Sequence, residues 1–191
     1  GFKNAWSEFH FNFTGADNHV GVTAAAPEEL LAERGWDRTF TSPQTTDNML
    51  QLYQLNGTVK ATDTLSISGN AYYRRFKQKH VDGNIVEAEG CGPDDKFLCI
   101  EDGLAFGKPG TPGVNGDGTI DFNPLAHYGS IDRTSQDADS WGVALQATDK
   151  SRLFGYRNQF TVGTSYDHGR VGYTADSELG TFLPRFVVKG T

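Results

Sequence analysis

The two cysteines of the chain, Cys91 and Cys99, are the residues whose spacing most clearly defines their chemistry. They lie eight positions apart in a segment rich in glycine and proline, so a disulfide between them would close a small ring. In an exported protein such a bond restricts the unfolded chain by about 2 to 3 kcal/mol. A zinc site would need two more ligands, and none lies at zinc-finger spacing. We therefore expect a disulfide, with free thiols or an isolated metal pair as the alternatives.

A second group of oxygen-bearing side chains lies in residues 113–121, whose pattern is that of the first nine positions of a calcium-binding loop. The positions that would carry ligands are Asn115, Asp117, Thr119 (through its carbonyl) and Asp121. The first position is Gly113 and the twelfth is Pro124, so the full motif fails. The segment is a candidate for weak calcium binding, and the alternative is a plain pair of Asn-Gly and Asp-Gly turns.

Signatures of enzymes are missing from the rest of the sequence. The five histidines are scattered, and none forms a metalloprotease or deaminase signature. We find no phosphate-binding loop, no nucleophile elbow and no convincing pair of catalytic acids. The sequence therefore predicts a protein that is not an enzyme and that requires no cofactor.

The net charge of −7 is concentrated in one part of the chain. Between Lys79 and Asp137 the acidic residues outnumber the basic ones by seven, so the remainder is neutral. This stretch also contains several Gly-Pro turns, and we expect it to be one long solvated loop. With a sequence pI near 5.1, nucleic acid is not an expected partner.

Five segments alternate between apolar and polar residues with the period of a β-strand. They are residues 2–14, 48–60, 65–78, 138–148 and 158–168, separated by long loops at 15–47, 79–137 and 169–186 and by short turns elsewhere. The first loop contains a short helix over 27–35, with proline at its start, acidic residues in its first turn and a glycine stop. The sequence predicts an all-β, antiparallel fold.

The strands have the length and the two faces of membrane-crossing strands. About 9 to 11 residues cross a bilayer at a tilt, whereas an ordinary strand has about 5 to 6. One face is Ser, Thr, Asn, Gln and Gly, which would line a wet lumen; the other carries aromatics at its ends, namely Phe9, Tyr53, Tyr73, Trp141 and Tyr166. The alternative is a soluble β-sandwich with one face of each sheet in a shared core.

The strand and loop sequences resemble the barrel of TonB-dependent outer-membrane receptors. The resemblance covers most of the chain except the acidic segment, and it is carried by EFHFNFTGADN at 8–18, PEELL at 27–31, PQTT at 43–46, LNG at 55–57, DTLSISGNAYYR at 63–74 and SELG at 177–180. It implies an antiparallel transmembrane β-barrel of 22 strands in the bacterial outer membrane, with long extracellular loops. This chain would supply about five of the strands as an internal piece, without the plug domain.

The resemblance also implies a function and partners. Such a receptor takes up a metal chelate of the siderophore type, or a similar scarce nutrient, with energy from the TonB inner-membrane complex, which acts through the plug. Outer-membrane lipid would surround the barrel. On the lumen side, His10, Asn12, Tyr72 and Arg74 are candidates to contact an anionic chelate, with Arg74 foremost because its guanidinium is a fork of donors. Alternatively, Arg74 pairs with a carboxylate of the plug or of a neighbouring strand.

A second function fits the same residues. The chain would then be a secreted, calcium-stabilised β-sandwich that binds or adheres to a partner through the acidic segment. Dependence on detergent distinguishes the two functions, since only the barrel needs it.

Overall fold

The computed structural model describes residues 1–21, 26–36, 40–100, 103–110, 114–183 and 187–190. Its fold is nearly all β, and every strand pair with a defined register is antiparallel, as the sequence predicts. No helix among these residues is long and apolar enough to cross a bilayer.

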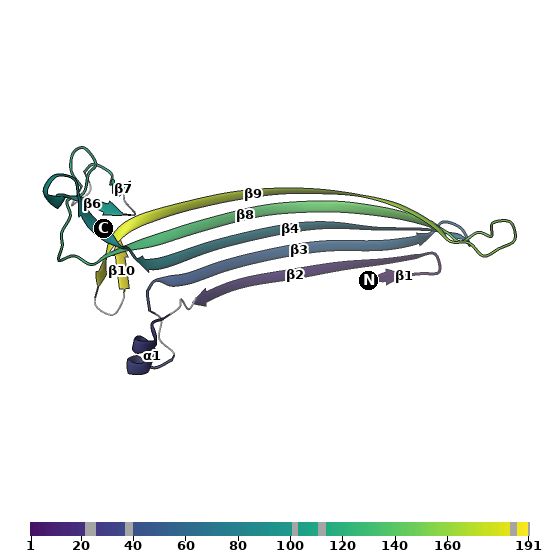
Figure 1. Ribbon diagram of the computed structural model, residues 1–191. Coiled ribbons are helices and arrows are strands. Elements are labelled where there is room, and N and C mark those ends of the chain that lie inside the picture. Colours follow the sequence, from purple (N-terminus) through teal and green to yellow (C-terminus); the bar gives the residue numbers. More distant parts are fainter. Residues whose placement is uncertain (22–25, 37–39, 101–102, 111–113, 184–186, 191) are drawn as a thin grey trace. The chain divides into compact units, whose positions relative to one another are not determined.

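The strands form two sheets (Figure 1). The larger sheet has the order β1-β2-β3-β4-β8-β9-β10 and contains β1 (Phe2–Lys3), β2 (Ser7–Gly21), β3 (Gln44–Lys60), β4 (Leu65–Ile85), β8 (Tyr128–Asp149), β9 (Phe160–Leu183) and β10 (Val187–Gly190). The smaller sheet has the order β5-β6-β7 and contains β5 (Ala88–Cys91), β6 (Phe97–Ile100) and β7 (Gly103–Leu104). The helices are α1 (Glu28–Arg34) and the 3₁₀ helix η1 (Pro93–Asp95).

The five predicted strands are present, but four of them extend far into the expected loops. β2 runs to Gly21, β4 to Ile85 and β9 to Leu183, while β8 begins at Tyr128. The loops expected at 15–47, 79–137 and 169–186 are therefore wrong in their bounds. Beyond the alternating stretches, polar residues predominate on both faces of the strands. The alternation of apolar and polar residues therefore ends there, although the strands continue. One link between these extensions is the hydrogen bond from Asn84 Nδ2 to Asp132 Oδ2, at 2.7 Å.

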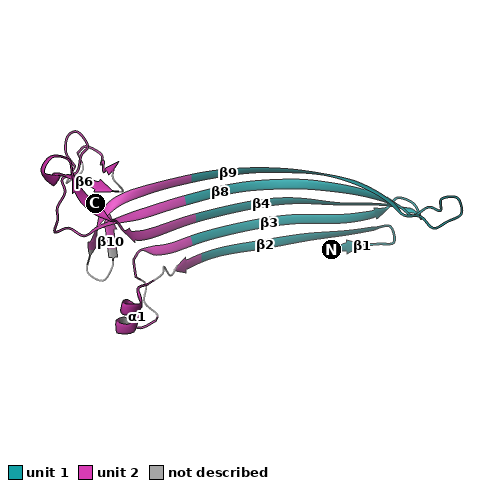
Figure 2. Cartoon of the chain, in the orientation of Figure 1, with its two compact units in different colours: residues 1–18, 47–78, 135–173 teal, residues 19–46, 79–134, 174–191 magenta. Residues whose placement is uncertain are grey.

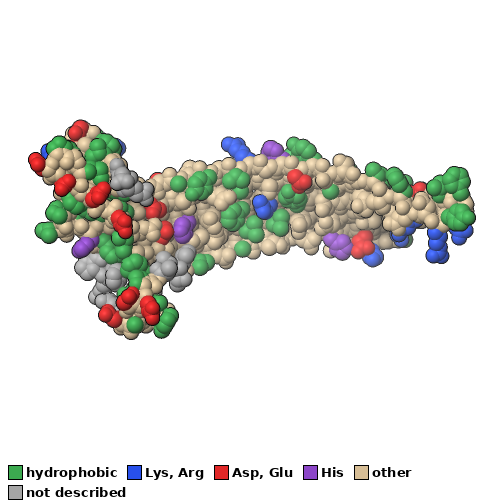
Figure 3. All heavy atoms as spheres, in the orientation of Figure 1, with side chains coloured by type: hydrophobic (Ala, Val, Ile, Leu, Met, Phe, Trp, Pro, Cys, Tyr) green, Lys and Arg blue, Asp and Glu red, His purple; other side chains and the backbone are tan. Residues whose placement is uncertain are grey.

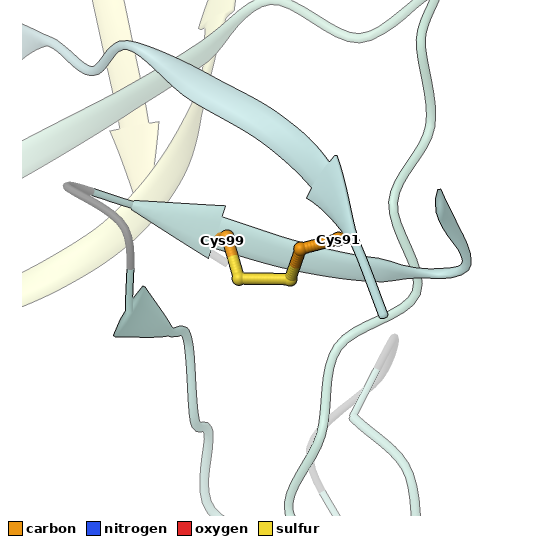
Figure 4. The surroundings of a disulfide bond; sticks show 2 residues. All are labelled: Cys91 and Cys99. Atoms are coloured by element: carbon orange, nitrogen blue, oxygen red, sulfur yellow. A yellow bond between two sulfur atoms is a disulfide. The ribbon is translucent and has the colours of Figure 1, made fainter. Parts of the chain in front are cut away.

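The acidic segment is also more ordered than a solvated loop. It contains the smaller sheet, in which Leu98 is fully buried. Isolated bridges join Phe97 to Asp121, Phe106 to Thr119 and Val114 to Ile120. Cys91 and Cys99, on the paired strands β5 and β6, form a disulfide with their Cα atoms 5.9 Å apart (Figure 4).

The helix expected at 27–35 is α1. Pro27 precedes it, Glu28 and Glu29 occupy its first turn, and Gly35 follows its last residue with φ at 94°. A positive φ at this place favours glycine, and the Gly35 amide donates to the Leu31 carbonyl to close the helix.

The chain divides into two compact units (Figure 2). Unit 1 comprises residues 1–18, 47–78 and 135–173, and unit 2 comprises residues 19–46, 79–134 and 174–191. Unit 1 contains most of the alternating strand segments. Unit 2 contains α1 and the smaller sheet.

In unit 1 the sheet exposes large apolar side chains on one side, and hydrophobic atoms are visible along the long strands (Figure 3). We call this side the apolar face; it consists of Phe9, Phe11, Phe13, Tyr53, Leu55, Val59, Ile67, Tyr73, Trp141, Val143, Leu145, Phe160, Val162 and Tyr166. Leu145, at its middle, is 60% exposed. Large side chains lie beside glycines of the next strand: a Cβ on Gly57 would overlap the Phe9 ring, and one on Gly69 would overlap Leu145. The large side chains of the apolar face are exposed, and among the described residues of unit 1 no second layer covers them.

Candidate ligand-binding surface

The opposite side of unit 1, here called the polar face, contains two hollows. The first has a volume of about 710 Å³ and is lined mainly by Ser, Thr, Asn, Gln and Gly of β3, β4, β8 and β9, together with Glu8 and His10 of β2. The second has a volume of about 520 Å³ and is lined by Leu52, Gln54, Tyr72, Arg74, Ser140, Asp167, His168 and Gly169. Both are open. The lining of the first is mainly polar, which suits a hydrated polar ligand more than an apolar one, whereas the lining of the second is mixed, with somewhat more apolar than polar surface.

A hydrogen bond across three strands forms the floor of the second hollow. The Tyr72 hydroxyl on β4 donates to Asp167 Oδ1 on β9 at 2.8 Å, and β8 lies between these two strands. The bond passes Gly142 of β8, where a Cβ would overlap both the Tyr72 ring and the Asp167 carboxylate. Gly142 therefore makes room for the Tyr72–Asp167 pair.

Arg74 lies at the same hollow with its side chain exposed. Among the described residues it forms no ion pair, although the Asp167 carboxylate lines the same hollow. Its neighbour Arg75 points to the other side of the sheet, where its Nε atom is 4.0 Å from Asp139 Oδ1. Arg74 is thus a cation available to an anionic ligand, and the Tyr72 hydroxyl and the Gln54 amide are polar groups at the same hollow.

The four predicted ligand residues are not all brought together. Tyr72 and Arg74 share the second hollow, whereas His10 lies at the first. The His10 Nε2 atom is 2.8 Å from Glu8 Oε1, and Glu8 also pairs with Lys3 at 2.9 Å. Asn12 lines neither hollow.

Sequence reasoning missed Asp167, which lines the second hollow, and Gly142, which makes room for the Tyr72–Asp167 hydrogen bond. Asp167 carries the one charge among the polar-face positions 161, 163, 165, 167 and 169 of β9, and this isolated charge could have been noticed. Gly142 carries no comparable signal, because glycine recurs on many strands of this chain and its role depends on the two side chains that meet beside it.

Aromatic members of the apolar face contact one another near one end of it. The Phe13 and Tyr53 ring centroids are 4.9 Å apart, those of Tyr53 and Tyr73 are 6.4 Å apart, and those of Trp141 and Tyr166 are 5.5 Å apart. The Tyr73 hydroxyl donates to Asp139 Oδ1 at 2.7 Å. Charged pairs follow immediately along the same strands, with Lys77 Nζ 3.0 Å from Asp137 Oδ2. The face changes from apolar to aromatic to charged within a few residues.

In unit 2, Asp132 is the centre of a hydrogen-bonded cluster that joins β4, β8 and β9. It accepts hydrogen bonds from Asn84 Nδ2, Ser130 Oγ and Ser177 Oγ. Burial raises the pKa of the Asp132 carboxyl, but these donors stabilise its charged form, and the pKa is lowered overall. This cluster ties together the strand extensions that the sequence did not predict.

The candidate calcium ligands lie close together, but they form hydrogen bonds with one another. Asp117 Oδ1 accepts from the Thr119 amide at 3.0 Å and from the Thr119 hydroxyl at 2.7 Å, and these bonds lower the pKa of Asp117. The Asn115 amide donates to Thr119 Oγ1 and to Asp121 Oδ1, both at 3.0 Å. Gly113, the first position of the motif, lies outside the described residues. As arranged, the side chains form a hydrogen-bonded turn, and a cation would have to replace several of these bonds.

The chain matches no family model, no curated protein and no solved structure.

Proposed function

We propose that the chain forms part of the wall of a transmembrane β-barrel in the bacterial outer membrane. One observation carries this proposal: the sheet of unit 1 has an exposed apolar face on one side, with aromatic rings at its end and charged pairs beyond them, and an open, mainly polar hollow on the other. A lipid bilayer imposes this order, because aromatic side chains favour the interface and charges favour water beyond it.

The dimensions are of the same order as a membrane-crossing strand. From Leu65 to Tyr73 the apolar positions of β4 span about 26 Å along the strand at about 3.3 Å per residue. At a strand tilt of about 40° this length corresponds to about 20 Å of height, compared with an apolar band of roughly 25 Å in outer-membrane barrels. In a soluble β-sandwich a second sheet would cover the apolar face. Unit 1 contains no second sheet among its described residues, and its large apolar side chains are exposed, so we infer that lipid is the covering layer.

The edges of the sheet require further strands. β1 pairs with β2 only at Phe9 and Glu8, and β10 pairs with β9 only from Gly180 to Leu183. In lipid each unpaired backbone group costs several kcal/mol. We therefore infer that these five long strands lie within a larger closed barrel, for which the resemblance to TonB-dependent receptors gives 22 strands and a separate plug.

The proposed activity is active uptake of an anionic metal chelate of the siderophore type or a similar nutrient, without covalent chemistry. The free guanidinium of Arg74 beside Tyr72 and Gln54 suits carboxylate or other oxyanion groups of such a chelate. Energy would come from the TonB complex through the plug.

Two matched substitutions on adjacent residues of β8 test the membrane assignment. Arginine at Leu145, in the middle of the apolar face, should cost about 2 to 4 kcal/mol of folding free energy in lipid vesicles, whereas arginine at Gln146, on the polar face, should cost little. Guanidinium titration of the vesicle-inserted protein and the amount of folded protein in outer membranes measure the effect. Equal effects of Leu145→Arg and Gln146→Arg, or a protein that stays monodisperse without detergent, would contradict the proposal.

A further inference from the structure

The connection between β8 and β9, residues 150–159 of unit 1, ends in an exposed apolar tip. Leu153 is 56% exposed, Phe154 90% and Tyr156 79%. At the corresponding end of the molecule in Figure 3, hydrophobic atoms lie at the extremity with lysine and arginine atoms beside them. We call residues 150–159 the β8–β9 tip.

The turn at the tip holds a phenylalanine in an unfavourable conformation. Leu153 and Tyr156 exchange both backbone hydrogen bonds, at 3.1 and 3.0 Å, so Phe154 and Gly155 are the two central residues. Their φ angles are 51° and 84°, as in a type I′ turn, where Asn-Gly is the usual pair. A phenylalanine at the first position is strained, and its exposed ring gains no packing within the described chain. Contacts of the Phe154 ring with a partner outside the described chain would account for a phenylalanine at this strained position.

Cations surround the apolar tip. Lys150, Arg152 and Arg157 are exposed and form no ion pair among the described residues. Residues 150–159 contain no acidic residue. The nearest acidic residue along the sequence, Asp149, accepts hydrogen bonds from the Ser151 amide and hydroxyl at 2.9 and 2.7 Å, and Asp63 lies in the adjacent connection. The tip therefore presents three cations and three apolar side chains to its surroundings.

The neighbouring connection, at residues 61–64 between β3 and β4, shows that this composition is not required for turning the chain. The Lys150 amide donates to the Thr64 carbonyl at 2.9 Å, so the two connections are adjacent. This connection contains no large apolar residue, since its sequence is Ala-Thr-Asp-Thr, and Thr62 Oγ1 accepts a hydrogen bond from the Leu65 amide at 3.0 Å within the turn. The β8–β9 tip thus has a composition that its neighbour lacks.

We propose that the β8–β9 tip inserts Leu153, Phe154 and Tyr156 into the interface of a leaflet of anionic phospholipid, with its three cations on the lipid phosphates. Apolar and aromatic side chains flanked by Lys and Arg are the composition that binds to anionic bilayer surfaces. The proposal rests on the proposed function, which places the strand ends at the membrane surface. We choose lipid as the partner because the positive charge of the tip is complementary to anionic headgroups. The apolar side chains of the tip also project from a turn and do not line a groove that could hold a protein segment.

Fluorescence from single labelled cysteines tests the proposal. The native cysteines are joined in a disulfide, so an introduced cysteine is the free thiol that takes a polarity-sensitive dye. The dye is placed on Phe154→Cys at the tip, on Asp63→Cys in the adjacent polar turn as the matched control, and on Leu145→Cys in the apolar face. The whole protein is reconstituted in vesicles of phosphatidylcholine, with or without one third phosphatidylglycerol, and quenching by lipids with a doxyl group near the headgroup is compared with quenching by aqueous iodide.

We expect the tip dye to shift to shorter wavelength and to be quenched by shallow doxyl lipid, more strongly when phosphatidylglycerol is present. The dye at position 63 should remain accessible to iodide. Replacing Lys150, Arg152 and Arg157 together by glutamine should abolish the effect of phosphatidylglycerol, because one basic residue near an anionic surface changes partitioning by about fivefold.

Three results would overturn the proposal. The tip dye could be as accessible to iodide as the dye at position 63, or its response could be independent of phosphatidylglycerol and of the three cations. It could also be protected only when soluble polyglutamate is added, which would indicate an acidic protein partner instead of lipid. The dye at Leu145 separates this failure from that of the proposed function: if it is quenched by lipid while the tip is not, only the tip proposal fails.

Discussion

The Tyr72 hydroxyl donates a hydrogen bond to the Asp167 carboxylate on a strand two places away in the sheet, over the bare backbone of Gly142. This bond joins two side chains that line the floor of the hollow at which Arg74 lies. It joins β4 to β9 on the polar face, whereas the aromatic and charged pairs of β4 lie on the other face. The two faces of the sheet are therefore built from different interactions.

Substitution of Gly142 should disturb this bond. Gly142→Val places a branched side chain where the Tyr72 ring and the Asp167 carboxylate lie, and we expect a loss of about 1 to 3 kcal/mol in folding free energy. If the clash with Tyr72 is the cause, Tyr72→Ala should recover a large part of this loss in the double variant. Denaturant unfolding of the two single variants and the double variant measures the coupling. Additive effects would show that the clash lies elsewhere.

Arg74 and Arg75 form a matched pair on opposite faces. We expect Arg74→Ala to lower the affinity for an anionic chelate by about tenfold to a hundredfold, because a charged hydrogen bond contributes about 1.5 to 3 kcal/mol. Arg75→Ala, which removes a side chain near Asp139 on the other face, should leave the affinity unchanged. Uptake of radioactive iron supplied as ferric citrate provides the measurement. A similar loss in both variants would indicate a general structural effect.

The Asp132 cluster should make stability depend on pH. Because the pKa of Asp132 is lowered in the folded protein, its stabilising contribution is complete above the unfolded value of about 3.9 and is lost as the pH falls through the folded pKa. We expect Asp132→Asn to cost about 1 to 3 kcal/mol at neutral pH and less at about pH 3. Guanidinium titrations across this range measure the difference. Asp63→Asn, at an exposed turn, is the control, and a constant cost at every pH would contradict the prediction.

Reduction of the Cys91–Cys99 disulfide should loosen the smaller sheet. The bond closes a short loop between β5 and β6, and its removal should destabilise this part by about 2 to 3 kcal/mol. In a Cys91→Ser, Cys99→Ser variant, trypsin should cut faster at Lys96, while cleavage at Arg152 in unit 1 stays unchanged. Unchanged cleavage at Lys96 would show that the burial of Leu98 and the β5–β6 pairing hold this sheet without the disulfide.

The strand positions could be predicted from the sequence where one face differs from the other. The series Phe9, Phe11, Phe13 and the series Trp141, Val143, Leu145 alternate with polar residues, and both lie in strands on the apolar face. Beyond this region the pattern ends but pairing continues, as at Asn84 and Asp132. Those hydrogen bonds join residues far apart in sequence, so no local pattern reports them.

The candidate site was predictable only in part for the same reason. Arg74 and Tyr72 follow from strand register on β4, since residues two apart share a face. Their distance from His10 could not be predicted, because it depends on how β2 and β4 are staggered across β3. The role of Gly142 depends on two side chains from two other strands.

Contact of the apolar face with lipid is tested most directly at two adjacent residues of β8. A dye on Leu145→Cys and a dye on Gln146→Cys lie on opposite faces of the same strand. In vesicles that contain doxyl lipid, we predict strong quenching at position 145 and little at position 146, with aqueous iodide quenching in the reverse order. Equal quenching by lipid at both positions, or iodide quenching that is stronger at 145, would contradict a membrane-facing apolar side and a wet polar side.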